Sequence, residues 1–159
     1  MSKTELKETH DSVWAEHEEA KKEWAQAQTE EARNRVKAKY PDFESGHLPR
    51  TPSRIVYEAM KRYKDVETLT DSEIKYISKC EDVILNSPDG AEYAYHVASQ
   101  IRQDVWEEAE ECISGSAWWA YMYAAHVLKG PFQQGESMIM NHPVYGARYS
   151  KLLASITGA

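Results

Sequence analysis

Long hydrophobic runs are missing from this sequence of 159 residues, and so is the apolar core of a signal peptide. No apolar stretch approaches the ~18 residues that a membrane-spanning helix needs. Residues Met1 to Glu5 lead into charged residues instead of an apolar segment. We therefore expect a cytoplasmic protein without membrane contact.

The signature motifs of common enzymes and metal sites are missing as well. The sequence has no glycine-rich phosphate-binding loop and no Gly-x-Ser-x-Gly nucleophile turn. His17 begins a segment like a zinc-protease helix, but Lys21 stands where the second histidine is needed. Cys80 and Cys112 match no zinc pattern, and both fall on apolar helix faces. We predict a protein without catalysis, cofactor or metal; an enzyme without a recognisable motif is the third hypothesis.

Composition indicates a folded domain with an uneven charge distribution. Apolar residues make up 42% of the chain and charged residues 28%, which excludes a wholly disordered protein. The length suits one domain. The net charge of −7 divides into −5 over 1–32, +6 over 33–64, −10 over 65–112 and +2 over 113–159. Such segregation can steer charged partners.

Proline and glycine are absent from the N-terminal segment, which is rich in strong helix formers. Ser2 and Glu5 fit a capping box, so we predict one long helix over residues 1–40. A thin apolar stripe runs along it through Leu6, Val13, Ala20, Trp24 and Ala27. Such a helix needs a partner. It lies across the rest of the chain, pairs with a second copy in a homodimer, or engages a target.

A linker is predicted over residues 41–53, which contain three prolines and a glycine, and a helical body over residues 54–159. Thr51, followed by proline, supplies a helix N-cap. Thr70 and Glu73 form a second capping box. The body therefore begins with two separately capped helices.

The second half of the chain repeats itself at a separation of 26 residues. Residues 110–113 are echoed by residues 136–139, and residues 119–127 by residues 145–153. A period of this length, with two apolar helical patterns per unit, is typical of stacked helix pairs. We predict an all-α protein in which the long N-terminal helix precedes a short α-solenoid-like body. Its repeat units cover about 77–103, 106–130 and 132–156.

Aligning the units gives a set of positions that we expect to be buried, called the frame. Small residues in it let helices approach closely, and aromatic residues fill the space beside them. In the short helices the frame is Ile77/Trp106/Phe132, Cys80/Ala109/Gly135 and Ile84/Ile113/Ile139. In the long helices it is Tyr93/Trp119/Tyr145, Ala94/Ala120/Gly146, Val97/Tyr123/Tyr149, Ala98/Ala124/Ser150 and Ile101/Val127/Leu153. We predict that Glu81, Glu110 and Glu136, which also recur, each accept a hydrogen bond from a tyrosine hydroxyl or a helix N-terminus.

The stretch from Ala120 to Glu136 carries a family likeness. It resembles a tandem repeat found in proteins of tailed bacteriophages and some bacteria, with units of the form A-Y-x-Y-A-x-x-V-L-K-G-x-[FW]-x-x-[GA]-E. The likeness covers roughly residues 80–153, with one good copy and two degraded ones; in the third, Ala147 replaces a tyrosine. The resemblance implies no catalytic motif. It implies a phage or prophage origin and an accessory role acting on a host component.

Candidate anchors of a protein interface are the tryptophans outside the frame, namely Trp14, Trp24 and Trp118. An acidic edge surrounds Trp106 in the sequence and consists of Asp104, Glu107, Glu108, Glu110 and Glu111. Its candidate interface residues are Glu107, Glu108 and Glu111. The leading hypothesis is a non-catalytic interaction module, phage-encoded, that binds a host protein and modulates or inhibits it.

The basic segment over residues 33–64 supports the alternative hypothesis of nucleic-acid binding. Its cations alternate with tyrosines, and cations bind phosphate while aromatic rings stack on bases. The residues expected to contact nucleic acid are Arg33, Arg35, Lys61 and Arg62. The opposing interpretation is a solvated helix surface that pairs with the acidic segments on either side.

Overall fold

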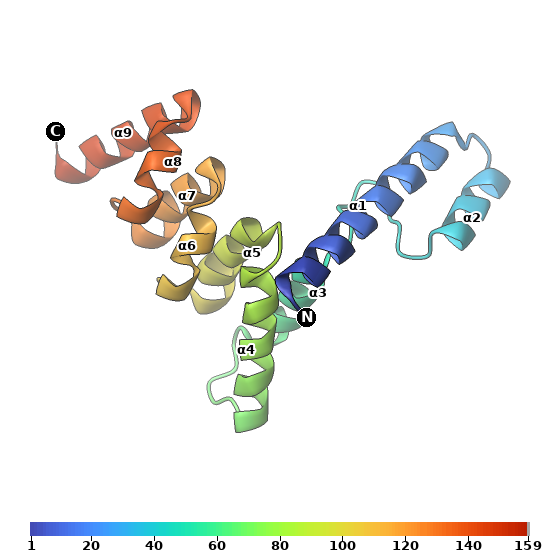
Figure 1. The fold of residues 1–159 in the computed structure, drawn as a ribbon, viewed down its shortest axis with the longest axis horizontal. Helices are drawn as coiled ribbons and strands as arrows, with labels where there is room; N and C mark the ends of the chain where they lie inside the picture. The colour runs from blue at the N-terminus through green and yellow to red at the C-terminus, as the bar shows by residue number, and fades with distance from the viewer. Residues whose placement is uncertain (159) are drawn as a thin grey trace.

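The chain folds into helices joined by turns, and it has two parts. In the computed structural model, which describes residues 1–158, those residues form no strand, so the predicted all-α class is confirmed. Helices α1 (Lys3–Gln26) and α2 (Glu30–Lys39) form a hairpin, called the arm. The helices from α3 (Pro52–Met60) onward form the repeat body. Figure 1 shows the arm and the body diverging like the limbs of a V, with α2 at the far end of the arm.

The predicted single helix over residues 1–40 is wrong in extent, because the chain breaks after α1 and reverses. Ala27 adopts an extended conformation, and its N–H bonds to the carbonyl three residues back. The Thr29 hydroxyl then accepts the Ala32 N–H and caps α2. Helix propensity alone favours an unbroken helix, but the cap and the packing of α2 on α1 override it.

The apolar stripe of α1 is largely covered within the chain. The buried residues of the arm are Leu6, Ala20, Ala27 and Val36. Polar contacts also join its helices: Lys39 Nζ donates to Glu23 Oε1 at 3.1 Å, and Arg33 Nε donates to the Ala27 carbonyl at 3.2 Å. An unpaired stripe is the reason for expecting a homodimer. Because α2 and the body cover much of the stripe, the covered part gives no reason to expect a homodimer.

A small polar cluster joins the arm to the body. The Thr51 hydroxyl, which caps α3, donates to Asp89 Oδ2 at 2.6 Å. His10 Nε2 of α1 lies 4.0 Å from the same carboxylate oxygen. The first turn of α1 borders the turn at residues 86–88. The N-terminal end of α1, rather than its whole length, is thus seated on the body.

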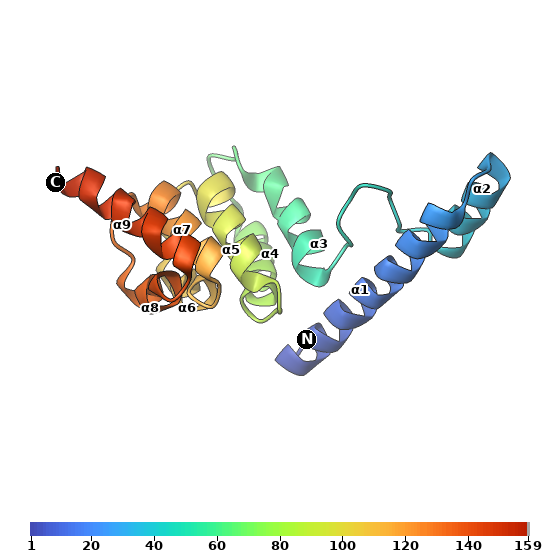
Figure 2. The same ribbon diagram turned by 90° about the horizontal axis from the view of Figure 1, so that it is seen from above.

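The repeat body stacks three helix pairs after α3 and the single turn η1 (Lys61–Tyr63). The first pair is α4 (Asp71–Leu85) with α5 (Gly90–His96) and its π-helical continuation η2 (Val97–Arg102). The second is η3 (Glu107–Ala109) and α6 (Glu110–Ile113) with α7 (Ala117–Tyr123) and the π-helical η4 (Ala124–Leu128). The third is η5 (Gln133–Gly135) and α8 (Glu136–Met140) with α9 (Pro143–Thr157). Figure 2 shows α5, α7 and α9 along one side of the body and α6 and α8 along the other.

Three helices begin at the capping residues that the sequence indicates. Ser2 and Glu5 form the capping box of α1, and Thr70 and Glu73 form that of α4. α3 begins at Pro52, inside the range assigned to the linker, because Thr51 caps it. Short-range side-chain signals therefore fix where these three helices begin.

Most of the frame is buried as predicted. The side chains of Tyr123 and Tyr149 have no exposed surface, and Trp106 and Phe132 are each 2% exposed. The small residues fit the same account: a Cβ built on Gly135 would lie 3.1 Å from the Cβ of Ala120 in the preceding unit. Frame residues on the outer flank are only partly buried, namely Ile77, Ile101, Trp119, Val127, Tyr145 and Leu153. Ser150 of the third unit is exposed, unlike Ala98 and Ala124 at the equivalent positions.

The first two long helices end in matching left-handed turns. Gln103 has φ 54° and Lys129 has φ 52°, so the left-handed residue is not the glycine that the Gly130-Pro131 stop signal suggests. The following N–H groups close each turn on a carbonyl six residues back, Asp104 on Ala98 at 3.1 Å and Gly130 on Ala124 at 3.2 Å. The sequence period therefore extends to the backbone hydrogen bonds.

Candidate interaction surface

Buried tyrosine hydroxyls lock the second and third units. The Tyr123 hydroxyl accepts the Trp106 N–H at 3.1 Å and donates to Glu110 Oε2 at 2.7 Å. In the next unit the Tyr149 hydroxyl accepts the Phe132 N–H at 3.0 Å. Burial, reinforced by Glu110, raises the pKa of Tyr123, so its hydroxyl stays neutral and able to donate. These bonds tie each long helix to the start of its own unit and give the outer side chains a rigid base.

The recurrent glutamates have separate partners. Glu110 accepts a tyrosine hydroxyl as predicted, whereas Glu81 pairs with Arg102 Nη1 at 2.7 Å. Burial raises the pKa of Glu81, and the Arg102 charge opposes this effect. Burial also raises the pKa of Tyr149, and Glu136 adds to it. Acid–base catalysis needs carboxylates that face one reacting atom, and these three bond within successive units instead.

Aromatic rings follow one another along the long-helix side of the body, from Tyr57 on α3 to Tyr145 on α9. The successive centroid distances are 5.8 Å from Tyr57 to His96, 5.2 Å from His96 to Trp119, 6.1 Å from Trp119 to Trp118 and 5.1 Å from Trp118 to Tyr145. All five side chains are partly exposed. We call these five residues the aromatic band. Its members come from four helices, so the stacking of the units assembles it.

Two further tyrosines bridge successive long helices. The Tyr95 ring lies 5.4 Å from Trp119, and the Tyr121 ring lies 6.4 Å from Tyr145 with the planes 8° apart. Ala147 occupies the equivalent position of α9.

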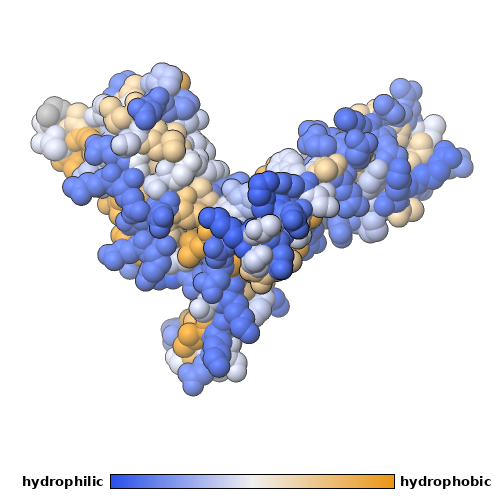
Figure 3. Space-filling model, in the orientation of Figure 1, coloured by the Kyte–Doolittle hydropathy of each residue, from blue (hydrophilic) through white to orange (hydrophobic). Residues whose placement is uncertain are grey.

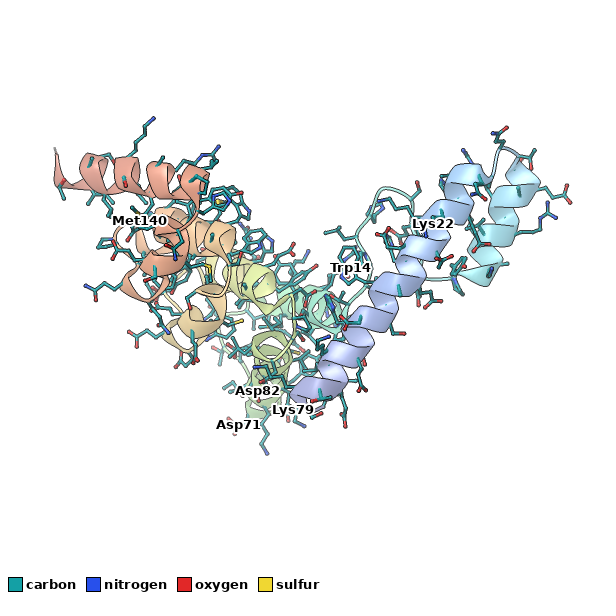
Figure 4. All side chains as sticks on the ribbon, turned by 45° about the horizontal axis from the view of Figure 1, so that its top comes forward. Trp14, Lys22, Asp71, Lys79, Asp82 and Met140 are labelled. Atoms are coloured by element: carbon teal, nitrogen blue, oxygen red, sulfur yellow. The ribbon has the colours of Figure 1, made fainter. Side chains whose placement is uncertain are left out.

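A second aromatic group lies in the arm. Its centroid distances are 6.0 Å from Trp14 to His17, 5.3 Å from His17 to Phe43 and 5.9 Å from Phe43 to Trp24. A small cavity of about 70 Å³ opens beside His17 and Phe43. Burial lowers the pKa of His17, so the neutral imidazole is favoured. Figure 4 places Trp14 near the middle of α1, on the side toward the repeat body.

The predicted anchor Trp24 is engaged inside the arm. The Arg33 guanidinium lies 5.1 Å from the Trp24 ring centroid, and Lys37 Nζ lies 5.8 Å from it. These two cations of α2 lie over the Trp24 ring, and the Phe43 ring also contacts it.

The charge of Arg54 on α3 affects the pKa of a residue in the arm and of a residue in the body. Burial lowers the pKa of His17 in the arm and raises that of Tyr93 in the body, and the Arg54 charge lowers both. Arg54 Nε donates to Glu58 Oε1 at 3.1 Å, which holds the guanidinium in place. The charge of Arg54 therefore acts on one residue of the arm and on one residue of the body.

The predicted acidic edge lies in the other layer of the body. The carboxylates of Glu107, Glu108 and Glu111 are exposed on η3 and α6. Trp106, which they surround in sequence, is buried and lies 5.1 Å from the Arg102 guanidinium. The structure thus separates this edge from Trp118, which belongs to the long-helix layer.

The predicted nucleic-acid residues fall into two groups. Arg33 and Arg35 lie on α2 at the far end of the arm, and Lys61 and Arg62 lie on η1, which directly follows α3. All four are exposed. Lys61 Nζ lies 5.0 Å from the Tyr57 ring centroid and so borders the aromatic band. The basic segment is continuous in sequence but divided in space.

Sequence reasoning missed three residues of this surface. Tyr57 and His96 belong to the aromatic band, and Met122 is partly exposed one turn after Trp118. A signal was available, because 96 and 122 are equivalent positions outside the frame, 26 residues apart. Tyr145 was assigned to the core, yet it is only partly buried. Figure 3 shows hydrophilic residues over most of the arm and more hydrophobic surface over the body.

Comparisons of the chain with protein-family models, curated proteins and solved structures give no match. Within residues 1–158, no group of three or more His, Cys, Asp or Glu side chains is arranged to hold a metal ion. The same residues include no helix with the length and apolarity to span a bilayer. The aromatic band, with Met122 on the same helix as Trp118, is the surface feature of the described residues that points to a function.

Proposed function

We propose that this chain is a non-catalytic protein-binding module that uses the aromatic band as its contact surface. The single observation that carries the proposal is that five aromatic side chains from four helices remain partly exposed in one continuous row. Partly exposed aromatic residues on a rigid support are the residues that dominate binding energy at protein interfaces. A preorganised surface also loses little conformational entropy on binding.

The biological setting that we propose follows from the resemblance of residues 80–153 to phage and bacterial repeat units. In this setting a phage-encoded accessory protein binds a host protein in the cytoplasm and modulates or inhibits it. A stacked-helix body suits this role because its surface is presented by packing alone and needs no ligand.

Affinity capture of the immobilised full-length chain with a bacterial lysate tests the proposal, at low and at moderate salt. We expect a specific protein to be retained by the wild type and lost from Met122→Glu and Trp118→Ala. Ile74→Glu is the matched control, since Ile74 is 52% exposed on α4, away from the band. Circular dichroism of each variant verifies the fold. Equal capture by all three variants contradicts the proposed surface, and no salt-stable capture contradicts the proposed function.

Nucleic-acid binding by the basic segment is measured on the same proteins by gel shift across a salt series. Its two cation groups do not form one footprint, and Arg33 already covers Trp24. We therefore expect no shift that depends jointly on Arg33, Arg35, Lys61 and Arg62. A joint dependence that weakens steeply with salt reverses the ranking of the two functions.

A further inference from the structure

The outward-facing positions of the long helices form parallel strips. Three positions one helical turn apart recur with the period of the repeat: Glu92, His96 and Ser99 on α5 and η2, Trp118, Met122 and Ala125 on α7 and η4, and Val144, Arg148 and Lys151 on α9. The first two strips are partly buried and the third is exposed. The frame is similar in every unit because packing dictates it, whereas these outward positions differ in chemistry. In a stacked-helix body such positions are the ones available for selecting a partner.

The strips on α7 and α9 combine an apolar patch with positive charge. Trp118 and Met122 of α7 are partly exposed, and Val144, which occupies on α9 the position equivalent to Trp118, is 50% exposed. Arg148 and Lys151 lie on the same side of α9, one and two turns further along. A partner for this surface needs apolar side chains for the patch and negative charge for the two cations.

Acidic residues are almost missing from this part of the chain. From residue 113 onward the only carboxylate side chain is Glu136, which lies on α8 in the other layer, next to Tyr149. Residues 65–112, in contrast, carry thirteen acidic residues and three basic ones. Carboxylates of a partner would therefore meet attraction without opposing charge at α7 and α9.

Ring geometry favours a protein segment over nucleic acid on this surface. Tyr145 already stacks on His142, with ring centroids 4.0 Å apart and planes 17° apart. Trp118 packs between Trp119 and Tyr145 at centroid distances of 6.1 and 5.1 Å. Base stacking needs a free ring face, and His142 already covers one face of Tyr145. The partly exposed Trp118 ring and the Met122 thioether suit aliphatic and aromatic side chains.

Spacing indicates the form of the segment. Packed helices lie about 8–10 Å apart, and two residues seven positions apart on a helix are separated by about 10 Å. An amphipathic helix laid across α7 and α9 can therefore seat one apolar side chain at Trp118 and Met122 and a second at Val144. Its flanking carboxylates then reach Arg148 and Lys151.

We propose that the outward face of α7 and α9 binds an acidic amphipathic helix of a partner protein. The proposal rests on the proposed protein-binding function and names the chemistry of the partner. The apolar side of the bound helix contacts Trp118, Met122 and Val144, and its acidic flank pairs with Arg148 and Lys151. The positive strip selects against basic helices of equal hydrophobicity.

Fluorescence anisotropy with two labelled synthetic helices and the full-length chain tests this inference. Both peptides carry leucine and phenylalanine at helical spacing; one has glutamate and the other lysine at all remaining positions. We expect at least tenfold tighter binding of the acidic peptide, and a smaller difference at high salt because the charges are screened. Equal affinity, or preference for the lysine peptide, overturns the proposal.

Charge-reversal variants locate the site. We expect Arg148→Glu with Lys151→Glu to weaken the acidic peptide at least tenfold. The matched control is Lys75→Glu with Lys79→Glu, which makes the same charge change at exposed positions of α4, where Figure 4 labels Lys79. Equal weakening by both pairs shows a non-specific charge effect and overturns the proposal. Single-stranded DNA is the third probe. The proposal is overturned if binding of the DNA depends on Arg148 and Lys151 and binding of the acidic peptide does not.

Failure of this inference is distinguishable from failure of the proposed function. Lysate capture that depends on Trp118, combined with no binding of the acidic peptide, leaves a protein-binding module with a different partner chemistry. If lysate capture does not depend on Trp118, the proposed protein-binding function itself is contradicted.

Discussion

The arm and the repeat body hold their helices together by different means. In the body, side chains recur at equivalent positions without exposed surface, as Ile84, Ile113 and Ile139 do. In the arm, contacts between α1 and α2 lie near the surface, such as the pairing of Lys39 with Glu23. Exposed ion pairs contribute about 0–1 kcal/mol, whereas a buried aromatic residue contributes several times more. Repeated burial therefore makes the body the stable part, and the arm depends on caps and surface contacts.

The largest expected effect comes from Tyr123→Ala in the body. Removal of this fully buried ring and its two hydrogen bonds should lower the free energy of unfolding by roughly 3–5 kcal/mol. Urea denaturation followed by circular dichroism measures it. Trp24→Ala in the arm is the comparison and should cost less than half as much, because that ring is only partly buried. Equal losses would contradict the division between the two parts.

Close packing around Gly135, within the third unit and against Ala120 of the second, gives the second prediction. A Cβ at Gly135 would lie 2.6 Å from the Phe132 ring, so Gly135→Ala should destabilise the chain by about 1–3 kcal/mol. Gly130→Ala is the control, because the nearest atom to its added Cβ is 3.8 Å away. Thermal melting of both variants gives the answer. A neutral Gly135→Ala would mean that the units are packed more loosely than described.

Loss of a helix cap should act differently in the two parts. Thr29→Ala removes the cap of α2 and should cost about 1 kcal/mol. We expect faster hydrogen exchange confined to α2, because the body does not depend on this helix. Ser116 caps α7 in the body, so Ser116→Ala should raise exchange throughout the stacked units. Exchange that spreads from Thr29→Ala into the body would show that the two parts unfold together.

The smallest effect concerns pH. Burial, with a contribution from Lys61, lowers the pKa of His96. The unfolded chain therefore takes up the proton first, and stability is lost as the pH falls below about 6.5. Glu81 and Glu92 have pKa values raised mainly by burial and act in the opposite direction. Because these effects oppose one another, the contribution of His96 is found from the difference in pH dependence of stability between the wild type and a His96 variant.

Urea titrations at about pH 7.5 and about pH 5.5 supply that difference. The loss of stability on acidification should be smaller in His96→Gln than in the wild type. His17→Gln is the arm comparison, since burial also lowers the pKa of His17. We expect it to change global stability less than His96→Gln does. An unchanged pH response in His96→Gln would contradict the inferred burial of the imidazole.

The sequence carries enough information for the helix class, the caps and most of the frame. Ser2, Thr51 and Thr70 cap helices through contacts three residues along the chain, and such short-range contacts are visible in sequence. Frame positions such as Tyr123 and Tyr149 follow from the internal repeat, because the same packing problem is solved in each unit.

The remainder depends on contacts between distant segments. The break at Ala27 is invisible in helix propensity, because the fold-back of α2 onto Trp24 stabilises it. The same reason explains why Tyr57 and His96 were missed as surface residues: α3 and α5 meet only in the folded chain. The division of the basic segment between α2 and η1 also follows from tertiary arrangement.

The left-handed turns at Gln103 and Lys129 give both junctions between repeat units the same backbone geometry. Each turn closes through the same backbone bond, so the rotation from one unit to the next is set locally. Another 26-residue module spliced in at either turn would inherit that rotation, if its long helix carried a ring equivalent to Tyr121. The molecule could thus grow a longer recognition platform by duplication, without any redesign of its interior.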